Sequence, residues 1–292
     1  YKAKDQTTLY MNLTNLDLSR WMTDQKSTEM SGLAIIDGSI TKSGSLDQID
    51  ITLEMSETKW HEKGEIFMHG QVSYQDSIIS TIDPFMIMIG ESYITIDGEG
   101  NFQNKAINVK GEMERAEVEL INRFLPINFN SGKATGNLIV RGDFFSPSVT
   151  TDLKCEKIIL DNFKLASLQF NSQINVNDTL TSGFVEMKAG KGRWEEKSFD
   201  SGTISATINN SNVIINNCHF KSGKDFLQFS GEYDGSNSYM LDRFQLALED
   251  NYLVNFKPLF FKVKDSIKSL ELEPFVFHIN DGILEGVIKQ DK

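Results

Sequence analysis

The feature that most constrains this chain is an alternation of apolar and polar residues that recurs along its whole length. Ile51, Leu53 and Met55 alternate with polar neighbours, and Phe275 and Phe277 belong to a similar run near the C-terminus. Successive side chains of a β-strand point to opposite faces, so a period of two predicts strands with one buried and one wet face. Asp-Gly and Asn-Asn turn signals separate the runs.

Helical patterns are scarce by comparison. Apolar residues occur at helical spacing over residues 116–125 and, more weakly, over residues 16–22. Both segments are too short to be independent domains, so we interpret them as short helices packed on a sheet. With roughly 20 candidate strands, the sequence predicts an all-β chain whose long sheet of amphipathic strands must twist, curl or close.

Two kinds of short segment each occur twice, and in the same order. The first kind reads GLAIIDG at residues 32–38 and GNLIVRG at residues 136–142. The second reads GESYITIDGE at residues 90–99 and GKDFLQFSGE at residues 223–232. We interpret this order as an internal duplication in which each unit adds strands to its neighbour.

The duplication predicts how the chain is divided. A first β unit is expected at residues 1–130 and includes both short helices, and a second unit with its continuation is expected at residues 131–292. The two units are expected to form one continuous elongated sheet. Because the chain begins at Tyr1 without an initiator Met, we expect a fragment of a larger protein, with any membrane anchor before Tyr1.

The charge of the chain excludes two classes of partner. The formal net charge is −12 at pH 7. A nucleic-acid-binding protein needs Lys and Arg to neutralise phosphates, and flat adhesion to an anionic membrane needs the same residues. We therefore interpret the acidity as a feature that keeps the protein soluble.

The two cysteines form no recognisable motif. Cys155 lies in phase with Leu153 and Ile159, and Cys218 lies in phase with Ile214 and Phe220. Both are interpreted as small apolar residues of strands. The sequence leaves open whether they form a disulfide.

Motifs that support catalysis or metal binding were sought, and none was found. The histidines have no ligand spacing; they are His61, His69, His219 and His278. Residues 190–194, GKGRW, resemble a phosphate loop but lack the strand–loop–helix context, so we interpret them as a hairpin turn. The sequence therefore predicts a protein that is not an enzyme, with no catalytic residue, metal or cofactor.

From residue 116 onward the sequence carries a pattern known from one family. A helical stretch ends in NRFLP, and SGKATGNLIVRGDFFSPSVTTDLKCEKI and LASLQFNSQI follow. This resembles the TamB-type translocation and assembly module proteins of the AsmA-like group. Thr150 and Thr151 stand where many family repeats have a further Gly. The residues that match the family pattern are Leu125, Pro126, Gly132, Gly136, Gly142 and Pro147.

The resemblance covers the chain from about Leu16 and implies a specific architecture and role. It implies a long U-shaped β-sheet, called a β-taco, whose inner face is hydrophobic. Family members are anchored in the inner membrane, cross the periplasm, and are implicated in moving phospholipid to the outer membrane and in assembling outer-membrane proteins. The implied partners are phospholipid acyl chains and an outer-membrane assembly protein.

The alternating residues also supply a candidate apolar wall on their own. Shielding a lipid tail from water is favourable by roughly 0.8 kcal/mol per methylene, and a one-faced sheet that curls without filling its interior can provide that shield. Two alternatives remain open: the same residues fill an ordinary sandwich core, or the chain is an extracellular β-sandwich or β-solenoid that binds glycans or other cells. The predicted groove lining is Ile51, Leu53, Met55, Ile94, Ile96, Leu138, Val140, Leu168, Phe170, Leu227, Phe229, Phe275 and Phe277.

Overall fold

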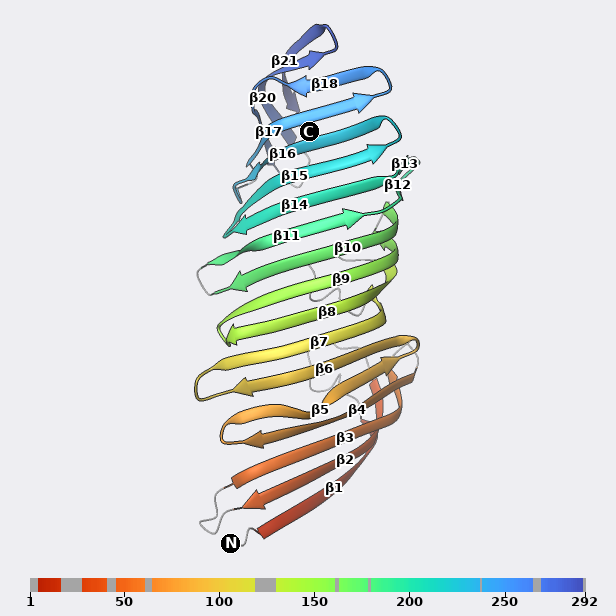
Figure 1. The fold of residues 1–292 in the computed structure, drawn as a ribbon, viewed down its shortest axis with the longest axis vertical. Helices are drawn as coiled ribbons and strands as arrows, with labels where there is room; N and C mark the ends of the chain where they lie inside the picture. The colour runs from red at the N-terminus through yellow and green to blue at the C-terminus, as the bar shows by residue number, and fades with distance from the viewer. Residues whose placement is uncertain are drawn as a thin grey trace. The chain divides into compact units, whose positions relative to one another are not determined.

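The structure, a computed structural model, consists of β-strands joined by turns (Figure 1). It describes residues 5–16, 28–40, 46–60, 65–118, 130–160, 163–177, 180–236, 238–264 and 269–290. The first strands are β1 (Asp5–Leu16), β2 (Thr28–Ile40), β3 (Leu46–Trp60), β4 (Glu65–Gln75), β5 (Ile78–Ile89), β6 (Ser92–Asn101), β7 (Ala106–Glu117) and β8 (Ser131–Asp143). The remaining strands are β9 (Ser146–Leu160), β10 (Phe163–Val176), β11 (Thr181–Ala189), β12 (Gly192–Trp194), β13 (Lys197–Phe199), β14 (Ser201–Asn209), β15 (Asn212–Ser222), β16 (Asp225–Tyr233), β17 (Ser238–Leu248), β18 (Asn251–Asn255), β19 (Leu259–Lys264), β20 (Ser269–Ile279) and β21 (Gly282–Gln290).

The chain divides into two compact units. Unit 1 comprises Tyr1–Glu117 and Ala134–Ser148, and unit 2 comprises Val118–Lys133 and Val149–Lys292. The boundary expected at residue 130 stays a prediction, as does the continuity of the two predicted units. Each unit is described below by itself.

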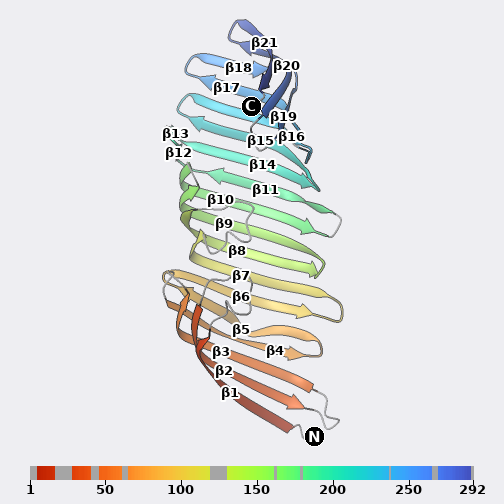
Figure 2. The same ribbon diagram turned by 180° about the vertical axis from the view of Figure 1, so that it is seen from behind.

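Unit 1 is an antiparallel meander, in which each strand from β1 to β7 pairs with the next one along the chain (Figures 1 and 2). Strand β8 continues this order beside β7. The Arg141 guanidinium donates to the Asn108 side-chain oxygen at 2.9 Å, and the Phe144 amide donates to the Lys105 carbonyl at 2.7 Å. Short hairpins of this kind bury one face of each strand against its neighbours.

Unit 2 is also antiparallel, but two of its strands are interrupted. Strands β11 and β12 both pair with β10 in one continuous register, and they are separated only at residues 190–191. Strands β18 and β19 both pair with β17, and the side chain of Asn255, the last residue of β18, forms hydrogen bonds at the interruption between them. The Asn255 side-chain amide donates to the carbonyls of Asp242 and Lys257, at 3.1 and 2.9 Å.

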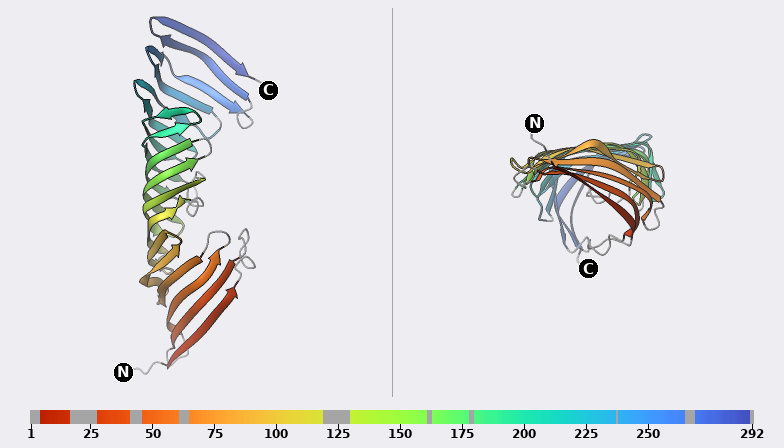
Figure 3. Two further views of the ribbon diagram at one scale, coloured as in Figure 1. Left: turned by 90° about the vertical axis from the view of Figure 1, so that its right-hand side faces the viewer. Right: turned by 90° about the horizontal axis from the view of Figure 1, so that it is seen from below.

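Bulges bend the strands within each unit (Figure 3). Register shifts occur in several unit 1 pairs, among them β3–β4 between Met55 and Thr58, and in unit 2 pairs such as β15–β16 between Ile215 and Cys218. An extra residue on one strand kinks it and increases its twist, which curls the sheet locally. The prediction of an all-β fold built on a large, curled antiparallel sheet is confirmed.

The second repeated segment has the same local structure in both copies. Gly90 begins the two-residue turn before β6, and Gly223 begins the one before β16, with φ of 57° and 60°. This left-handed conformation favours glycine, because a side chain would clash with the backbone. The aromatic position that follows, Tyr93 or Phe226, lies near the start of the new strand in each case.

Most residues of the two predicted short helices lie outside the described part of the chain. Leu16 is the last residue of β1, and Ala116 and Glu117 are the last residues of β7. Ala116 and Val118 have no exposed surface, so both side chains are buried where β7 ends. The rest of the two predicted helices, residues 17–22 and 119–125, is outside the described residues.

Candidate functional site

A row of apolar side chains crosses six neighbouring strands of unit 2. Residues that face each other in antiparallel strands share one face of the sheet, so the register shows which side chains lie together. Each member of the row pairs directly with the next: Phe170, Met187, Ile204, Cys218, Phe229 and Phe244.

A second apolar row runs beside the first. Its members also pair one to the next across consecutive strands, and they end on β20: Leu168, Ala189, Gly202, Phe220, Leu227, Leu246, Leu253 and Ile279. The two rows together cover one face of the sheet from β10 to β17 with hydrocarbon, and they offer no charged or amide group.

The other face of the same strands is polar. Stepping one residue along each strand gives a third row of paired residues: Gln169, Lys188, Thr203, His219, Gln228 and Gln245. Because a side chain alternates between faces at every residue, this contrast between neighbouring rows makes unit 2 a two-faced sheet.

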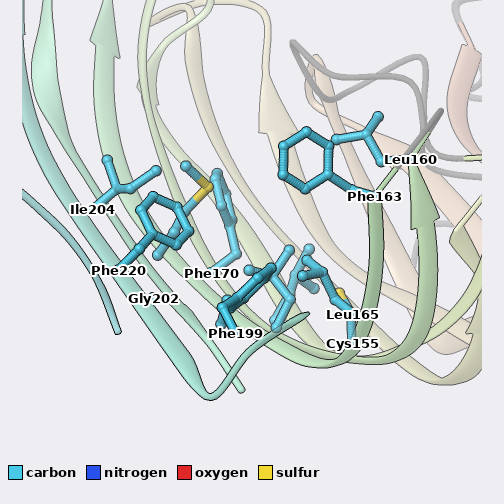
Figure 4. Close-up of a pocket in the computed structure, with 13 residues that line it drawn as sticks. Cys155, Leu160, Phe163, Leu165, Phe170, Phe199, Gly202, Ile204 and Phe220 are labelled. Carbon is cyan, nitrogen blue, oxygen red and sulfur yellow. The ribbon is translucent and has the colours of Figure 1, made fainter. Parts of the chain in front are cut away.

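The apolar face of unit 2 forms a partly open cavity of about 240 Å³ (Figure 4). Leu160 and Phe163 lie on one side of it, and Ile204 and Phe220 lie on the other. Among the described residues, its lining contains only apolar side chains and one glycine: Leu153, Cys155, Leu160, Phe163, Leu165, Leu168, Phe170, Met187, Ala189, Phe199, Gly202, Ile204 and Phe220. A cavity without polar partners does not hold water well and favours an apolar occupant.

The interrupted strand shapes one end of this cavity. The Gly190 amide donates to the Ser167 carbonyl at 3.0 Å and the Ala166 amide donates to the Lys191 carbonyl at 2.8 Å, so the ladder continues across the interruption. The chain then forms the β12–β13 hairpin, which carries Phe199 to the cavity. The GKGRW segment therefore lies before the hairpin turn and in β12; the expectation that it forms the turn is wrong, because the turn is at Glu195 and Glu196.

The two cysteines behave as apolar strand residues, as predicted. Both thiols are free, and both residues are about 3% exposed. Burial raises the pKa of the Cys155 and Cys218 thiols to about 11, because a thiolate loses its hydration there. Both therefore remain neutral at physiological pH and add to the hydrocarbon face.

Unit 1 repeats the two-faced plan with different side chains. An apolar row crosses β3 to β7, with Met55, Met68, Ile87, Ile94 and Met113 paired one to the next. A second row on the same face pairs Ile36 with Ile51 and Ile51 with Val72. The row on the opposite face is mostly polar: Glu54, His69, Met86, Thr95 and Glu112.

The apolar faces are only partly covered. Ile51 keeps 37% of its surface exposed and Ile96 keeps 36%, although both lie on the apolar face of unit 1. Met55 on the same face is 1% exposed. A filled sandwich core would bury all three alike, so the exposure of Ile51 and Ile96 favours a wall that is open to an occupant.

The structure places the predicted lining residues as follows. Leu168 and Phe170 line the cavity, and Leu227 and Phe229 continue their rows. Phe275 and Phe277 lie on β20 with ring centroids 5.2 Å apart. In unit 1, five residues lie on the apolar face of β3 and β6, and two lie on β8: Ile51, Leu53, Met55, Ile94, Ile96, Leu138 and Val140. Their role as a lipid groove stays a prediction.

Sequence reasoning missed the residues that complete the cavity. Phe199 and Phe220 form an edge-to-face pair at 5.6 Å, and neither was a predicted lining residue. The phase of Phe220 with Cys218 along β15 was visible in the sequence, but it was not used to assign Phe220 to the lining. Phe199 lies in a three-residue strand, which is too short for a period of two to be recognised.

No metal site or membrane-spanning helix is found among the described residues. No group of three or more His, Cys, Asp or Glu residues in the described ranges could hold a metal ion. In the same part of the chain, no helix has the length and apolar content needed to cross a membrane.

Comparison with known proteins places the chain in a family. The family model described as TamB, N-terminal domain, matches residues 11–242, which is more than half of the chain. Searches of curated proteins and of solved structures each found no match. The chain therefore belongs to the TamB family of translocation and assembly module proteins of the bacterial envelope.

Proposed function

We propose that the apolar face of this chain carries the acyl chains of phospholipids between the inner and outer membranes. The observation that supports this most is the cavity of about 240 Å³ in unit 2: its described lining consists of apolar side chains and a glycine, and it lies on a face crossed by two apolar rows. Each methylene shielded there contributes roughly 0.8 kcal/mol.

A carrier of this kind needs no catalytic residue. Neighbouring positions of the apolar rows are chemically similar, so an acyl chain can move from one pair of strands to the next without breaking a specific polar contact. The polar residues on the opposite face are solvated by water. The protein is accordingly a carrier and not an enzyme, and it uses no cofactor.

The setting of this carrier is the periplasm, as part of a protein anchored in the inner membrane through regions outside this segment. The family match supports that setting. An outer-membrane assembly protein is the proposed partner at the far end. The alternative, a glycan-binding module, requires aromatic platforms on a wet face, whereas Phe170, Phe220 and Phe229 lie on the apolar face.

The test is to purify the chain without detergent, extract it with organic solvent and identify lipids by mass spectrometry. We expect phospholipid in near-stoichiometric or greater amount. A photo-crosslinking residue at Phe170 should label lipid, whereas one at Gln169, its neighbour on the polar face, should not. A folded protein free of lipid, or equal labelling at both positions, would overturn the proposal.

A further inference from the structure

Several phenylalanine rings pack over glycines of the neighbouring strand. Phe220 pairs with Gly202 across β14 and β15, Phe199 pairs with Gly192 across β12 and β13, and Phe275 pairs with Gly286 across β20 and β21. In each pair the ring occupies the space that a Cβ on the glycine would need, with the nearest ring atom 2.5, 2.3 and 2.8 Å from that position, respectively. The largest apolar side chain is thus combined with the smallest residue, which keeps the ring close to the sheet.

Two of these pairs form a wall of the cavity. Phe199 and Phe220 line it, and Gly202 lies in the wall between them and is buried (Figure 4). The two rings are edge to face at 5.6 Å, which fixes each against the other. A change at Gly202 therefore acts directly on the width of the cavity.

Gly202 is not required by its backbone. It has an extended conformation that any residue can adopt, because its φ is not positive. Its neighbours give the reason for a glycine: a Cβ at this position would lie 2.5 Å from Cε1 and 2.7 Å from Cδ1 of Phe220. Carbon atoms in contact are about 3.5–4.0 Å apart, so the ring would have to move.

From this geometry we infer that Gly202 and Phe220 together set the room for an acyl chain in the cavity of unit 2: the glycine leaves space for the ring beside its strand, and the ring in that place leaves the cavity open. This inference rests on the proposed function. An apolar cavity of roughly 150 Å³ in another protein binds benzene, so the 240 Å³ found here accommodates more hydrocarbon than one ring. A side chain at position 202 displaces the Phe220 ring, and Phe199, whose ring centroid is 5.6 Å away, limits where that ring can move, so the displacement changes the cavity that both rings line.

The test compares Gly202→Ala with Gly286→Ala. In both, a new Cβ meets a phenylalanine ring, and neither glycine has a positive φ, but only Phe220 lines the cavity. The chain is purified without detergent, its lipid is quantified by mass spectrometry, and the delipidated protein is titrated with phosphatidylethanolamine that carries a fluorescent acyl chain. We expect Gly202→Ala to retain less than about a third of the wild-type lipid, because overpacking fills the cavity, and Gly286→Ala to retain nearly all of it.

A rescue variant separates a blocked path from a damaged fold. Gly202→Ala combined with Phe220→Leu removes the displaced ring and should restore lipid binding, while thermal unfolding confirms that all variants are folded. Equal lipid in wild type and Gly202→Ala, or a double variant that remains empty while folded, would overturn the inference. A wild-type protein that holds no lipid and does not bind the probe would instead overturn the proposed function.

Discussion

The two units use one design with different side chains. Eight of the ten methionines belong to unit 1, whereas fifteen of the twenty phenylalanines belong to unit 2. Methionine predominates in the apolar row of unit 1 that begins at Met55, and phenylalanine occupies both ends of the unit 2 row from Phe170 to Phe244. In both units the opposite face of the same strands is polar.

This difference separates what the register does from what the side chains do. The antiparallel register alone creates an apolar face in each unit, since it places apolar residues opposite one another. Side-chain chemistry then determines how rigid the face is. Methionine has several rotatable bonds and adapts its shape, whereas phenylalanine is rigid and packs ring against ring, as Phe244 and Phe277 do at 6.0 Å. Unit 1 thus offers an adaptable wall, and unit 2 a wall of fixed shape.

The largest expected effect is on stability, and it shows whether the apolar faces of the two units are equally important for folding. Leu168→Asp in unit 2 places a carboxylate at a position that is 6% exposed, and Met55→Asp in unit 1 places one at a position that is 1% exposed. Each should destabilise its unit by about 4 kcal/mol or more, because a buried charge without a partner is strongly unfavourable. Urea unfolding followed by residue-specific hydrogen exchange measures both.

The controls are on the wet faces of the same strands. Gln169→Asp and Glu54→Gln change charge where the side chains are exposed, so each should alter stability by less than about 0.5 kcal/mol. If Met55→Asp were as mild as Glu54→Gln, the apolar face of unit 1 would not be a structural face, and the comparison between the units would fail.

The sequence predicted the faces but not the cavity, and the reason is physical. Alternation along one strand assigns Leu168 and Phe170 to the same face without knowledge of any partner strand. A cavity depends on which strands meet and on where their phase shifts. The interruption at Gly190 and the bulge near Cys218 determine that Phe199 and Phe220 converge. Neither the interruption nor the bulge can be recognised from the alternation of apolar and polar residues. Which residues pair between strands that are far apart in the sequence is decided only when the sheet folds.

A second prediction sharpens the contrast in rigidity. Met68→Leu in unit 1 should cost less than about 1 kcal/mol, because Met and Leu have similar volume and the neighbouring Met55 can adjust. Phe277→Leu in unit 2 should cost about 1–2 kcal/mol, since it removes ring contacts to Phe244 and Phe275 as well as volume. Chemical denaturation curves compare the two, and equal losses would show that the walls do not differ in rigidity.

A third prediction uses the fact that both cysteines lie in unit 2. The neutral thiol is favoured in the folded state, where its pKa is about 11, while in the unfolded chain it ionises near its ordinary value of about 9. Between pH 9 and 11 the unfolded state therefore binds fewer protons, and the stability of unit 2 falls as pH rises. Below pH 9 the contribution is fully present.

This pH effect is measured as the difference between wild type and a Cys155→Ala, Cys218→Ala variant, so that deprotonation of lysines and tyrosines cancels. Thermal unfolding at several pH values from 8 to 11 should show a steeper decline for wild type. Identical pH profiles would mean that the thiols are solvated in the folded protein, in conflict with their 3% exposure.

The smallest effect is expected at one ion pair of unit 1, between Arg115 and Glu91. The Arg115 guanidinium donates to a carboxylate oxygen of Glu91 at 2.8 Å, but the two side chains keep 59% and 67% of their surfaces exposed. Water and salt screen such a pair, so a double-mutant cycle with Arg115→Gln and Glu91→Gln should give a coupling of about 0.5 kcal/mol or less. The coupling should vanish in high salt. A coupling above about 1 kcal/mol would show that polar contacts at the strand ends, and not only the methionine-rich face, hold unit 1 together.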